Sequence, residues 1–357
     1  MSEDFIKLGW KAPSNIALVK YWGKKENQIP ANASLSITLD YATTSTFLSF
    51  KVKKVKDNRI SLTYFFHQVR EEKFENKIAA LLNRLIPEMP FLVDYELVFH
   101  SENNFPHSTG IASSASSMAA LALCLVHMEI LIKQTHQTKE TFFQRASYIA
   151  RLGSGSASRS IYGGLVTWGA VNGEVGTSDL FASPFNLDET SRLNSVRDII
   201  LIVSSQEKSM SSSIGHSQME QHPYRNGRIN QANANISELL SSVRTSDYAN
   251  IAKIAEIEAL SLHALLMTSG ADGFLLKPNT LQIIDEIKRF RNEHQLDLFF
   301  TIDAGPNVHL IYYEDQREQV LSFVERTLSI YCEDGKWIDD KIGEGPVCLT
   351  PQNLDLE

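Results

Sequence analysis

The chain has 357 residues, 43% of them apolar and 21% charged, which excludes intrinsic disorder and gives enough length for roughly two domains. Its formal net charge of -8 excludes general affinity for nucleic acid or anionic lipid, because a phosphate backbone needs a net basic surface. We therefore expect any bound anion to meet a local basic pocket.

Cysteine spacing and the first residues point to a cytoplasmic protein. Cys124, Cys332 and Cys348 are far apart and form no CxxC pair, and no histidines pair at i, i+4 with a glutamate, so we expect neither disulfides nor a protein-bound metal. The first residues lack the basic and apolar regions of a signal peptide. The longest apolar run, about residues 118–132, carries a histidine and a glutamate and is short for a membrane span, so we expect no membrane partner.

The first half of the chain begins with runs of β-branched residues separated by turn signals, which predict strands. These runs cover residues 12–22, 33–39, 43–52, 60–66 and 95–100. Apolar residues at helical spacing predict an amphipathic helix at 71–85, a more apolar and buried helix at 113–133, and a third helix at 138–152. A Gly/Ser-rich loop and a strand at 164–170 follow.

A polar stretch at residues 186–197 separates these elements from a second set, and we place the domain boundary there, giving domains 1–190 and 191–357. The second set has predicted strands at 198–204, 297–302 and 308–313 and predicted helices at 230–243, 248–268, 280–295 and 316–329. Strands and helices do not alternate strictly, which favours an α+β fold over a doubly wound parallel sheet.

A loop rich in small residues and hydroxyls leads into the predicted helix at 113–133. It reads Asn104-Phe-Pro-His-Ser-Thr-Gly-Ile-Ala-Ser-Ser-Ala-Ser-Ser117 and lacks the Gly-Lys-Ser/Thr of a Walker A loop. Free backbone N–H groups and the helix dipole at such an N-terminus attract anions, which favours a phosphate cradle. The alternative that Ser113 or Ser114 simply caps the helix stays equally open.

A second hydroxyl-rich turn, Gly153-Ser-Gly-Ser-Ala-Ser-Arg-Ser160, carries one arginine. A guanidinium is a planar, permanently charged fork that can hold a carboxylate or phosphate through two parallel bonds, and Ser154 and Ser156 add neutral donors. A Gly/Ser loop alone is more often a solvated connection, so it is Arg159 that favours an anion site.

The first predicted strand ends in a lysine beside two aromatic rings, Asn15-Ile-Ala-Leu-Val-Lys-Tyr-Trp-Gly-Lys24. Lysine rarely lies inside an apolar strand unless it is paired, so we expect Lys20 to face a carboxylate or a phosphate. Lys24 follows a glycine and could equally be a surface residue.

A predicted buried strand in the second half stops at an acid and a Gly-Pro turn, Phe299-Phe-Thr-Ile-Asp-Ala-Gly-Pro-Asn307. Asp303 either caps this turn or takes a hydroxyl proton during phosphoryl transfer. No local feature of the sequence decides between the two.

Taken together, in this order and at these separations, the four segments resemble the GHMP kinases and most closely the diphosphomevalonate decarboxylases. The resemblance implies an N-terminal ribosomal-protein-S5-domain-2-like layer and a C-terminal ferredoxin-like α/β sandwich. It also implies ATP-dependent phosphorylation of the tertiary 3-hydroxyl of (R)-5-diphosphomevalonate, followed by loss of phosphate and CO2 to give isopentenyl diphosphate. The implied cofactors are ATP and Mg2+, and the implied assembly is a homodimer.

The resemblance assigns roles to individual residues. Asp303 matches the catalytic aspartate, Arg159 the arginine that holds the substrate carboxylate, and Lys20 the lysine that completes the catalytic set. The implied substrate-binding residues are Asn15, Tyr21, Lys24, Ser154, Ser156 and Ser212. The implied ATP-binding residues are Pro106, Gly110, Ser113 and Ser114.

Departures from the family pattern leave alternatives open. His107 stands near the expected nucleotide phosphates, and residues 209–215 lack a basic residue that some members use for the diphosphate. Lys208, Lys77 or Lys73 could supply that charge. A monophosphate-specific decarboxylase, a mevalonate-type kinase without decarboxylation, and a non-catalytic binding protein therefore remain as alternatives.

Overall fold

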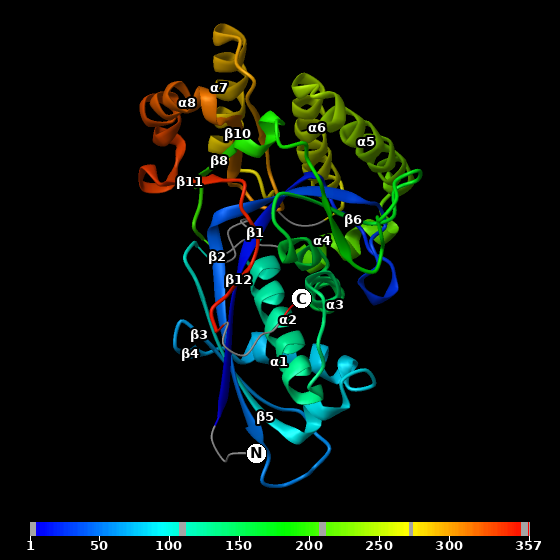
Figure 1. Cartoon of the computed structure of the whole chain (residues 1–357). Coiled ribbons are helices and arrows are strands. Elements are labelled where there is room, and N and C mark those ends of the chain that lie inside the picture. Colours follow the sequence, from blue (N-terminus) through cyan, green and yellow to red (C-terminus); the bar gives the residue numbers. More distant parts are fainter. Residues whose placement is uncertain (1–4, 107–111, 207–211, 271–273, 351–355, 357) are drawn as a thin grey trace.

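The structure, a computed structural model, describes residues 5–106, 112–206, 212–270, 274–350 and 356, and only the backbone of residues 212–214 (Figure 1). Two sheets with their covering helices make up the described chain. Gly110 and His107 lie outside the described residues, as does Lys208. The side chain of Ser212 is likewise not described.

The first sheet has eight strands in the described part of the chain, in the order β12-β1-β2-β5-β3-β4, with β6 paired to β2 and β7 to β6. The strands are β1 (Ile6–Val19), β2 (Ser34–Val52), β3 (Ser61–Phe66), β4 (Val69–Arg70), β5 (Tyr95–Asn103), β6 (Leu165–Trp168), β7 (Ala182–Phe185) and β12 (Val347–Cys348). The β3–β5 pair is parallel and the other pairs are antiparallel. The α+β prediction is therefore confirmed.

Strand β2 differs from the prediction, because the two strands expected at 33–39 and 43–52 form one continuous strand. The carboxylate of Asp340 accepts hydrogen bonds from the backbone N–H groups of Asp40, Tyr41 and Ala42 at 2.9, 2.7 and 2.8 Å. The polar interruption that looked like a turn is thus a stretch of strand held by a side chain 298 to 300 residues further along the chain.

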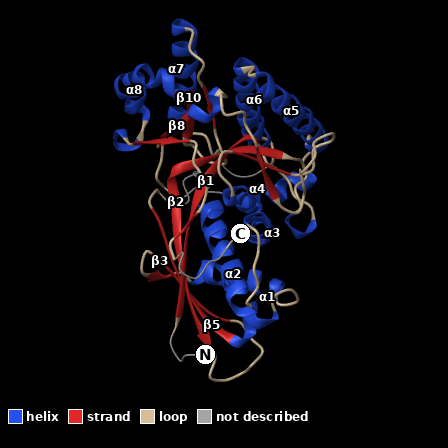
Figure 2. Ribbon diagram, viewed as in Figure 1, coloured by secondary structure: helices blue, strands red, loops and turns tan. Residues whose placement is uncertain are grey.

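Three helices, α1 (Glu72–Leu85), α2 (Ser113–Lys133) and α3 (Lys139–Gly153), pack against one face of the first sheet (Figure 2). Helix α2 is apolar on all sides, as expected of a helix buried between layers. By length and composition α2 could cross a membrane, but 89% of its most apolar window is buried inside the protein. It is therefore a core helix in this fold.

The second sheet has four antiparallel strands in the described residues, in the order β11-β8-β10-β9. These are β8 (Val196–Leu201), β9 (Phe299–Thr301), β10 (Val308–Tyr313) and β11 (Trp337–Lys341). Its helices are α4 (Ser212–Gln218), α5 (Arg225–Thr245), α6 (Tyr248–Met267), α7 (Pro278–His294) and α8 (Arg317–Phe323). The helix expected at 316–329 breaks after Phe323 into a π turn and a short 3-10 turn.

The two halves share one apolar cluster, and one strand of the second half joins the first sheet. Side chains of β1 and β2 pack with side chains of β8, β10, α5 and α6 in a single cluster, whereas α7 and α8 cover the other face of the second sheet. Near the end of the described chain, β12 returns to the first sheet, where Cys348 pairs with Trp10. The change of sheet falls between β7 and β8, and the boundary at 190 and 191 stays a prediction.

Candidate active site

The site is built around an ion pair that joins the two halves. Lys20 follows directly on β1, and Asp303 lies two residues beyond β9. Lys20 Nζ is 2.8 Å from Asp303 Oδ1, and their side chains are 3% and 25% exposed. Lys20 thus has the carboxylate partner expected for a lysine at the end of an apolar strand. The remaining exposure leaves part of the Asp303 side chain accessible to solvent.

Arg159 lies beside this pair in the 3-10 turn Gly155–Ile161. Its side chain is buried, and it donates to two neutral oxygens: Nε to Asn15 Oδ1 at 3.2 Å and Nη1 to Ser34 Oγ at 2.7 Å. Burial lowers the pKa of Arg159 to about 10, while the charge of Asp303 opposes this shift. The guanidinium is therefore charged at neutral pH and is fixed by groups that do not neutralise it.

The protonation state of Asp303 follows from its surroundings. Burial alone would raise the pKa of its carboxyl group, but the basic groups of Lys20, His309 and Arg159 outweigh burial and hold the pKa below its ordinary value. Burial lowers the pKa of Lys20 as well, although Asp303 and Glu258 oppose it. The predicted trio of Asp303, Lys20 and Arg159 is thus brought together with an ionised aspartate.

Lys20 is held in place by a buried network that sequence reasoning missed. Its backbone N–H donates to Glu258 Oε2 at 2.9 Å, and its carbonyl accepts from Asn32 Nδ2 at 3.0 Å. Arg228 of α5 donates through both terminal nitrogens to the Glu258 carboxylate of α6, and these two side chains are 2% and 0% exposed. The sequence signal that could have revealed this network is Glu258, a glutamate inside the apolar run of α6.

Asp303 also has a support that the sequence did not indicate. His263 of α6 lies with Nε2 3.1 Å from the Asp303 carbonyl oxygen. Burial lowers the pKa of His263 to about 4, so the ring is neutral at physiological pH and donates through Nε2–H. Nearby, the Thr301 hydroxyl donates to the Ala17 carbonyl at 3.2 Å and ties β9 to β1.

Several predicted substrate-binding residues gather next to the trio. The Asn15 amide donates to the Ser156 carbonyl and to the Ser160 hydroxyl, at 3.3 and 2.8 Å. Tyr21 is buried, and its hydroxyl has no hydrogen-bond partner among the described residues. A Cβ at Gly155 would stand 2.9 Å from that hydroxyl, so only glycine allows this approach. Ser154 and Ser156 remain partly exposed on the same turn.

Lys24 interacts electrostatically with other charged side chains. Burial lowers the pKa of Lys24, with Glu220 opposing and Arg84 adding to the shift. Desolvation lowers the pKa of Lys77 in α1 first and repulsion from Lys24 lowers it further, so the two charges are near enough to interact although Lys77 is exposed. Of Lys73 and Lys77, the two candidate basic residues that the structure describes, Lys77 is therefore the one whose charge acts together with that of Lys24.

The expected nucleotide loop is described only at its ends. Pro106 and Ser114 are partly exposed and Ser113 is buried at the first position of α2. The alternative that Ser113 or Ser114 caps the helix is wrong, because Ala112 occupies the cap position in the left-handed region (φ 49°) and has no side-chain oxygen to offer. A phosphate-binding role for this helix N-terminus stays a prediction.

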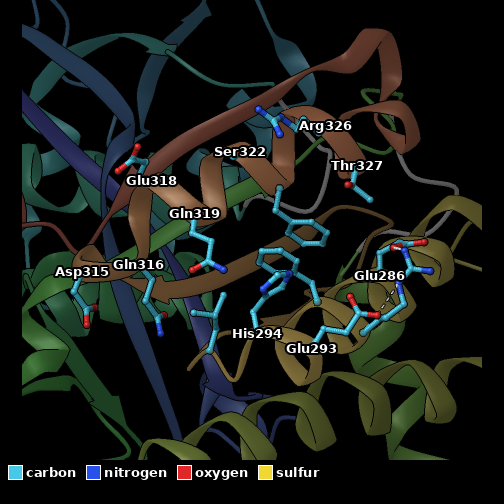
Figure 3. Close-up of a pocket in the computed structure, with 14 residues that line it drawn as sticks. Glu286, Glu293, His294, Asp315, Gln316, Glu318, Gln319, Ser322, Arg326 and Thr327 are labelled. Carbon is cyan, nitrogen blue, oxygen red and sulfur yellow. Dashed lines mark hydrogen bonds and ion pairs between the residues drawn. The ribbon is translucent and has the colours of Figure 1, made fainter.

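A surface hollow of about 830 Å3 lies between α7 and α8, away from this site (Figure 3). The rings of Phe290 and Phe323 line it and stack with their centroids 3.9 Å apart. Residues with carboxylate and guanidinium groups also line it. It is on the face of the second sheet that does not meet β1 and β2. None of the residues predicted to act in catalysis or binding lines it.

Two models of one protein family together match nearly the whole chain. Residues 12–180 match the diphosphomevalonate decarboxylase-like N-terminal domain, and residues 198–346 match the mevalonate 5-diphosphate decarboxylase C-terminal domain. The diphosphomevalonate decarboxylase of Candida albicans is 30% identical over 331 residues, covering 88% of this chain and 86% of the relative.

Two solved structures are similar to this fold. The mevalonate diphosphate decarboxylase from Legionella pneumophila is 30% identical to this chain and has a TM-score of 0.77. The match covers 93% of this chain and 100% of the Legionella chain. The protein MDDEF, solved in complex with MVAPP, AMPPCP and magnesium, has 25% identity and a TM-score of 0.79, covering 97% of this chain and 99% of its own.

Proposed function

The chain belongs to the diphosphomevalonate decarboxylase family, and we infer that it converts (R)-5-diphosphomevalonate and ATP to isopentenyl diphosphate, ADP, phosphate and CO2. The observation that carries this function is the 2.8 Å pair of Lys20 and Asp303, with charged Arg159 alongside. A tertiary alcohol is a crowded nucleophile, so catalysis depends on positioning and charge compensation, which this cluster supplies.

In the first step we assign Asp303 as the group that orients the 3-hydroxyl and accepts its proton while the oxygen attacks the γ-phosphorus of ATP. Its lowered pKa keeps it ionised for this purpose. The bond between the γ-phosphorus and the β–γ bridging oxygen breaks, and ADP leaves with the bonding electron pair. Lys20 stabilises the charge on the transferring phosphoryl group. Arg159 holds the substrate carboxylate. Its two hydrogen-bond partners, Asn15 and Ser34, are neutral, so its positive charge is not compensated and can attract an incoming anion.

In the second step the 3-phosphate leaves with its bonding electron pair, and the bond between the substrate carboxylate and its neighbouring carbon breaks. The electrons of that bond form the new C=C bond, and CO2 departs, so no electron-sink cofactor is needed. Magnesium would enter with ATP, held mainly by phosphate oxygens and water, as the complex of MDDEF with AMPPCP and magnesium supports.

The electrostatic interaction of Lys24 with Lys77 supports the diphosphate substrate over the monophosphate alternative. A bound anion offsets the repulsion between two ammonium groups, and a diphosphate carries more charge than a monophosphate. We propose that Lys77 completes this end of the site. The family resemblance further supports a cytoplasmic homodimer, which light scattering on the purified protein would test.

The deciding experiment is a product assay. Purified protein with Mg-ATP and diphosphomevalonate should release CO2 and isopentenyl diphosphate in equal amounts with ADP. Asp303→Asn should lower kcat by about 10^3-fold, because a general base contributes about 10^2–10^4. Asp315→Asn, whose side chain is 62% exposed near β10, serves as the control and should leave kcat unchanged. ADP without CO2 would favour the plain kinase, and no ADP above background would overturn the enzymatic function.

A further inference from the structure

His216, one turn from the start of α4, lies directly on the segment that carries Tyr21 and Lys24. Its ring centroid is 4.4 Å from that of Tyr21 and 4.6 Å from that of Trp22, so the imidazole sits between two aromatic rings. The side chain is buried. A helix of the second half thus contacts the loop that leaves β1 toward the expected diphosphate end of the site.

A hydrogen bond fixes the backbone of the same segment. The N–H of Gly23 donates to Nδ1 of His216 at 3.0 Å, and Gly23 has a φ of +88°, in the region that favours glycine. Because Nδ1 accepts, a neutral His216 ring carries its proton on Nε2. The turn between Trp22 and Lys24 is therefore held by a hydrogen bond to one specific nitrogen atom as well as by the packing of the rings.

The neighbouring residue shows how closely α4 approaches. A Cβ at Gly215 would stand 2.5 Å from the Trp22 ring, so any other residue there would push α4 away from the loop. The same contact sets the distance over which His216 reaches Gly23. The position of α4 and the conformation of the loop are consequently coupled.

We propose that His216 is a positioning residue for substrate binding, which holds Tyr21 and Lys24 in the orientation that receives the diphosphate group. This inference rests on the proposed function, since it takes the Tyr21–Lys24 segment as the diphosphate-binding part of the site. Packing alone would be satisfied by any ring at this position. The accepting nitrogen is what links His216 to the turn that precedes Lys24.

Three variants of His216 distinguish the packing of its ring from the hydrogen bond that its Nδ1 accepts. His216→Phe keeps a ring between Tyr21 and Trp22 but leaves the Gly23 N–H without its acceptor. The asparagine and leucine of His216→Asn and His216→Leu are similar in size, but only the asparagine has an oxygen near the position of Nδ1. His222→Asn is the matched control, because His222 is also a buried histidine whose Nδ1 accepts a backbone N–H, that of Tyr224, and its contacts within the described part of the chain include no predicted substrate residue.

We expect His216→Phe and His216→Leu to raise KM for diphosphomevalonate about tenfold, with KM for ATP and kcat changed by less than about threefold. His216→Asn should recover most of the loss in KM relative to His216→Leu. His222→Asn should lower thermal stability without moving KM. If His216→Phe does not fold, the contrast between asparagine and leucine decides, since the two side chains are similar in size and only asparagine offers an acceptor.

Equal KM values for the asparagine and leucine variants would overturn the proposal, as would a similar rise in KM for His222→Asn. Direct titration of diphosphomevalonate into each variant by calorimetry separates this failure from a failure of the proposed function. Wild-type protein that binds the substrate but releases no CO2 refutes the decarboxylase, while weaker binding by His216→Leu than by His216→Asn would still support the positioning role.

Discussion

At the scale of single residues, the site depends on the charge state of Asp303. Burial disfavours its ionised form, and only the basic groups around it, with Lys20 the nearest, reverse that effect. An aspartate whose folded pKa is depressed keeps its charge down to low pH and loses it as the pH falls through the depressed value. Activity should therefore persist well below neutral pH in the wild type.

Removing the partner charge tests this account. Lys20→Met leaves Asp303 buried but takes away its ion pair, so the pKa of Asp303 should rise and the acidic limb of kcat/KM should move to higher pH by about one unit or more. The pH profiles of the wild type and of the residual activity, measured from about pH 3 to about pH 9 in steps of roughly half a unit, give the shift. Lys51→Met, at the distant pair with Glu96, should leave the limb in place. An unmoved limb in Lys20→Met would contradict our reading of the pair.

At the scale of secondary-structure elements, the long strand β2 depends on a side chain from the second sheet. Asp340 of β11 satisfies three consecutive backbone N–H groups of β2, and its side chain is buried. Strand β2 in turn lies between β1, which leads to Lys20, and β5 and β6. Asp340 therefore stabilises the framework that carries the site without belonging to the site.

Asp340→Ala should lower the free energy of unfolding by about 3 kcal/mol, because it leaves backbone donors without acceptors at a partly buried position. Denaturant titration measures the loss. KM for both substrates should stay within about twofold, since the framework is weakened and no binding group is removed. Asp339→Ala is the adjacent control: its partners Arg317 and Arg197 are partly exposed, so the loss should be under about 1 kcal/mol. Equal losses for the two variants would refute the role given to Asp340.

At the scale of the whole molecule, Lys20, which we propose to be catalytic, is held by helices of the opposite half. The buried pair of Arg228 and Glu258 joins α5 and α6, and both residues bond to the backbone of Lys20. A buried ion pair is weak support for stability, because desolvation offsets the attraction. We infer that this one serves mainly to position Lys20.

A double substitution separates positioning from stability. Glu258→Leu alone should cost about 3–5 kcal/mol, because it leaves the Arg228 charge buried and unpaired. Adding Arg228→Met should restore most of the free energy of unfolding, since apolar side chains replace both charges. The double variant should nevertheless keep a kcat lowered by about tenfold or more, because the N–H of Lys20 has lost its acceptor. Full recovery of kcat in the stable double variant would show that the pair has no positioning role.

Much of the architecture was predictable from local patterns. The apolar periodicity that predicted helices at 71–85, 113–133 and 138–152 matches α1, α2 and α3 within a few residues. Short or interrupted elements were not predictable. Strand β12 consists of two residues, which are too few to show a periodic pattern. The continuity of β2 through residues 40–42 depends on Asp340, so no pattern within those residues indicates it.

Residue types and their order along the chain already identified a lysine at a strand end, an arginine in a serine-rich turn and an aspartate before a Gly-Pro turn, together with the family that they resemble. Only the tertiary structure decided that Lys20 and Asp303, 283 residues apart, meet at 2.8 Å, that Glu258 and His263 bond to their backbones, and that His216 bonds to the backbone of Gly23. Backbone preferences and apolar spacing act over a few neighbouring residues, whereas the burial and partners that set a charge arise when two sheets pack together.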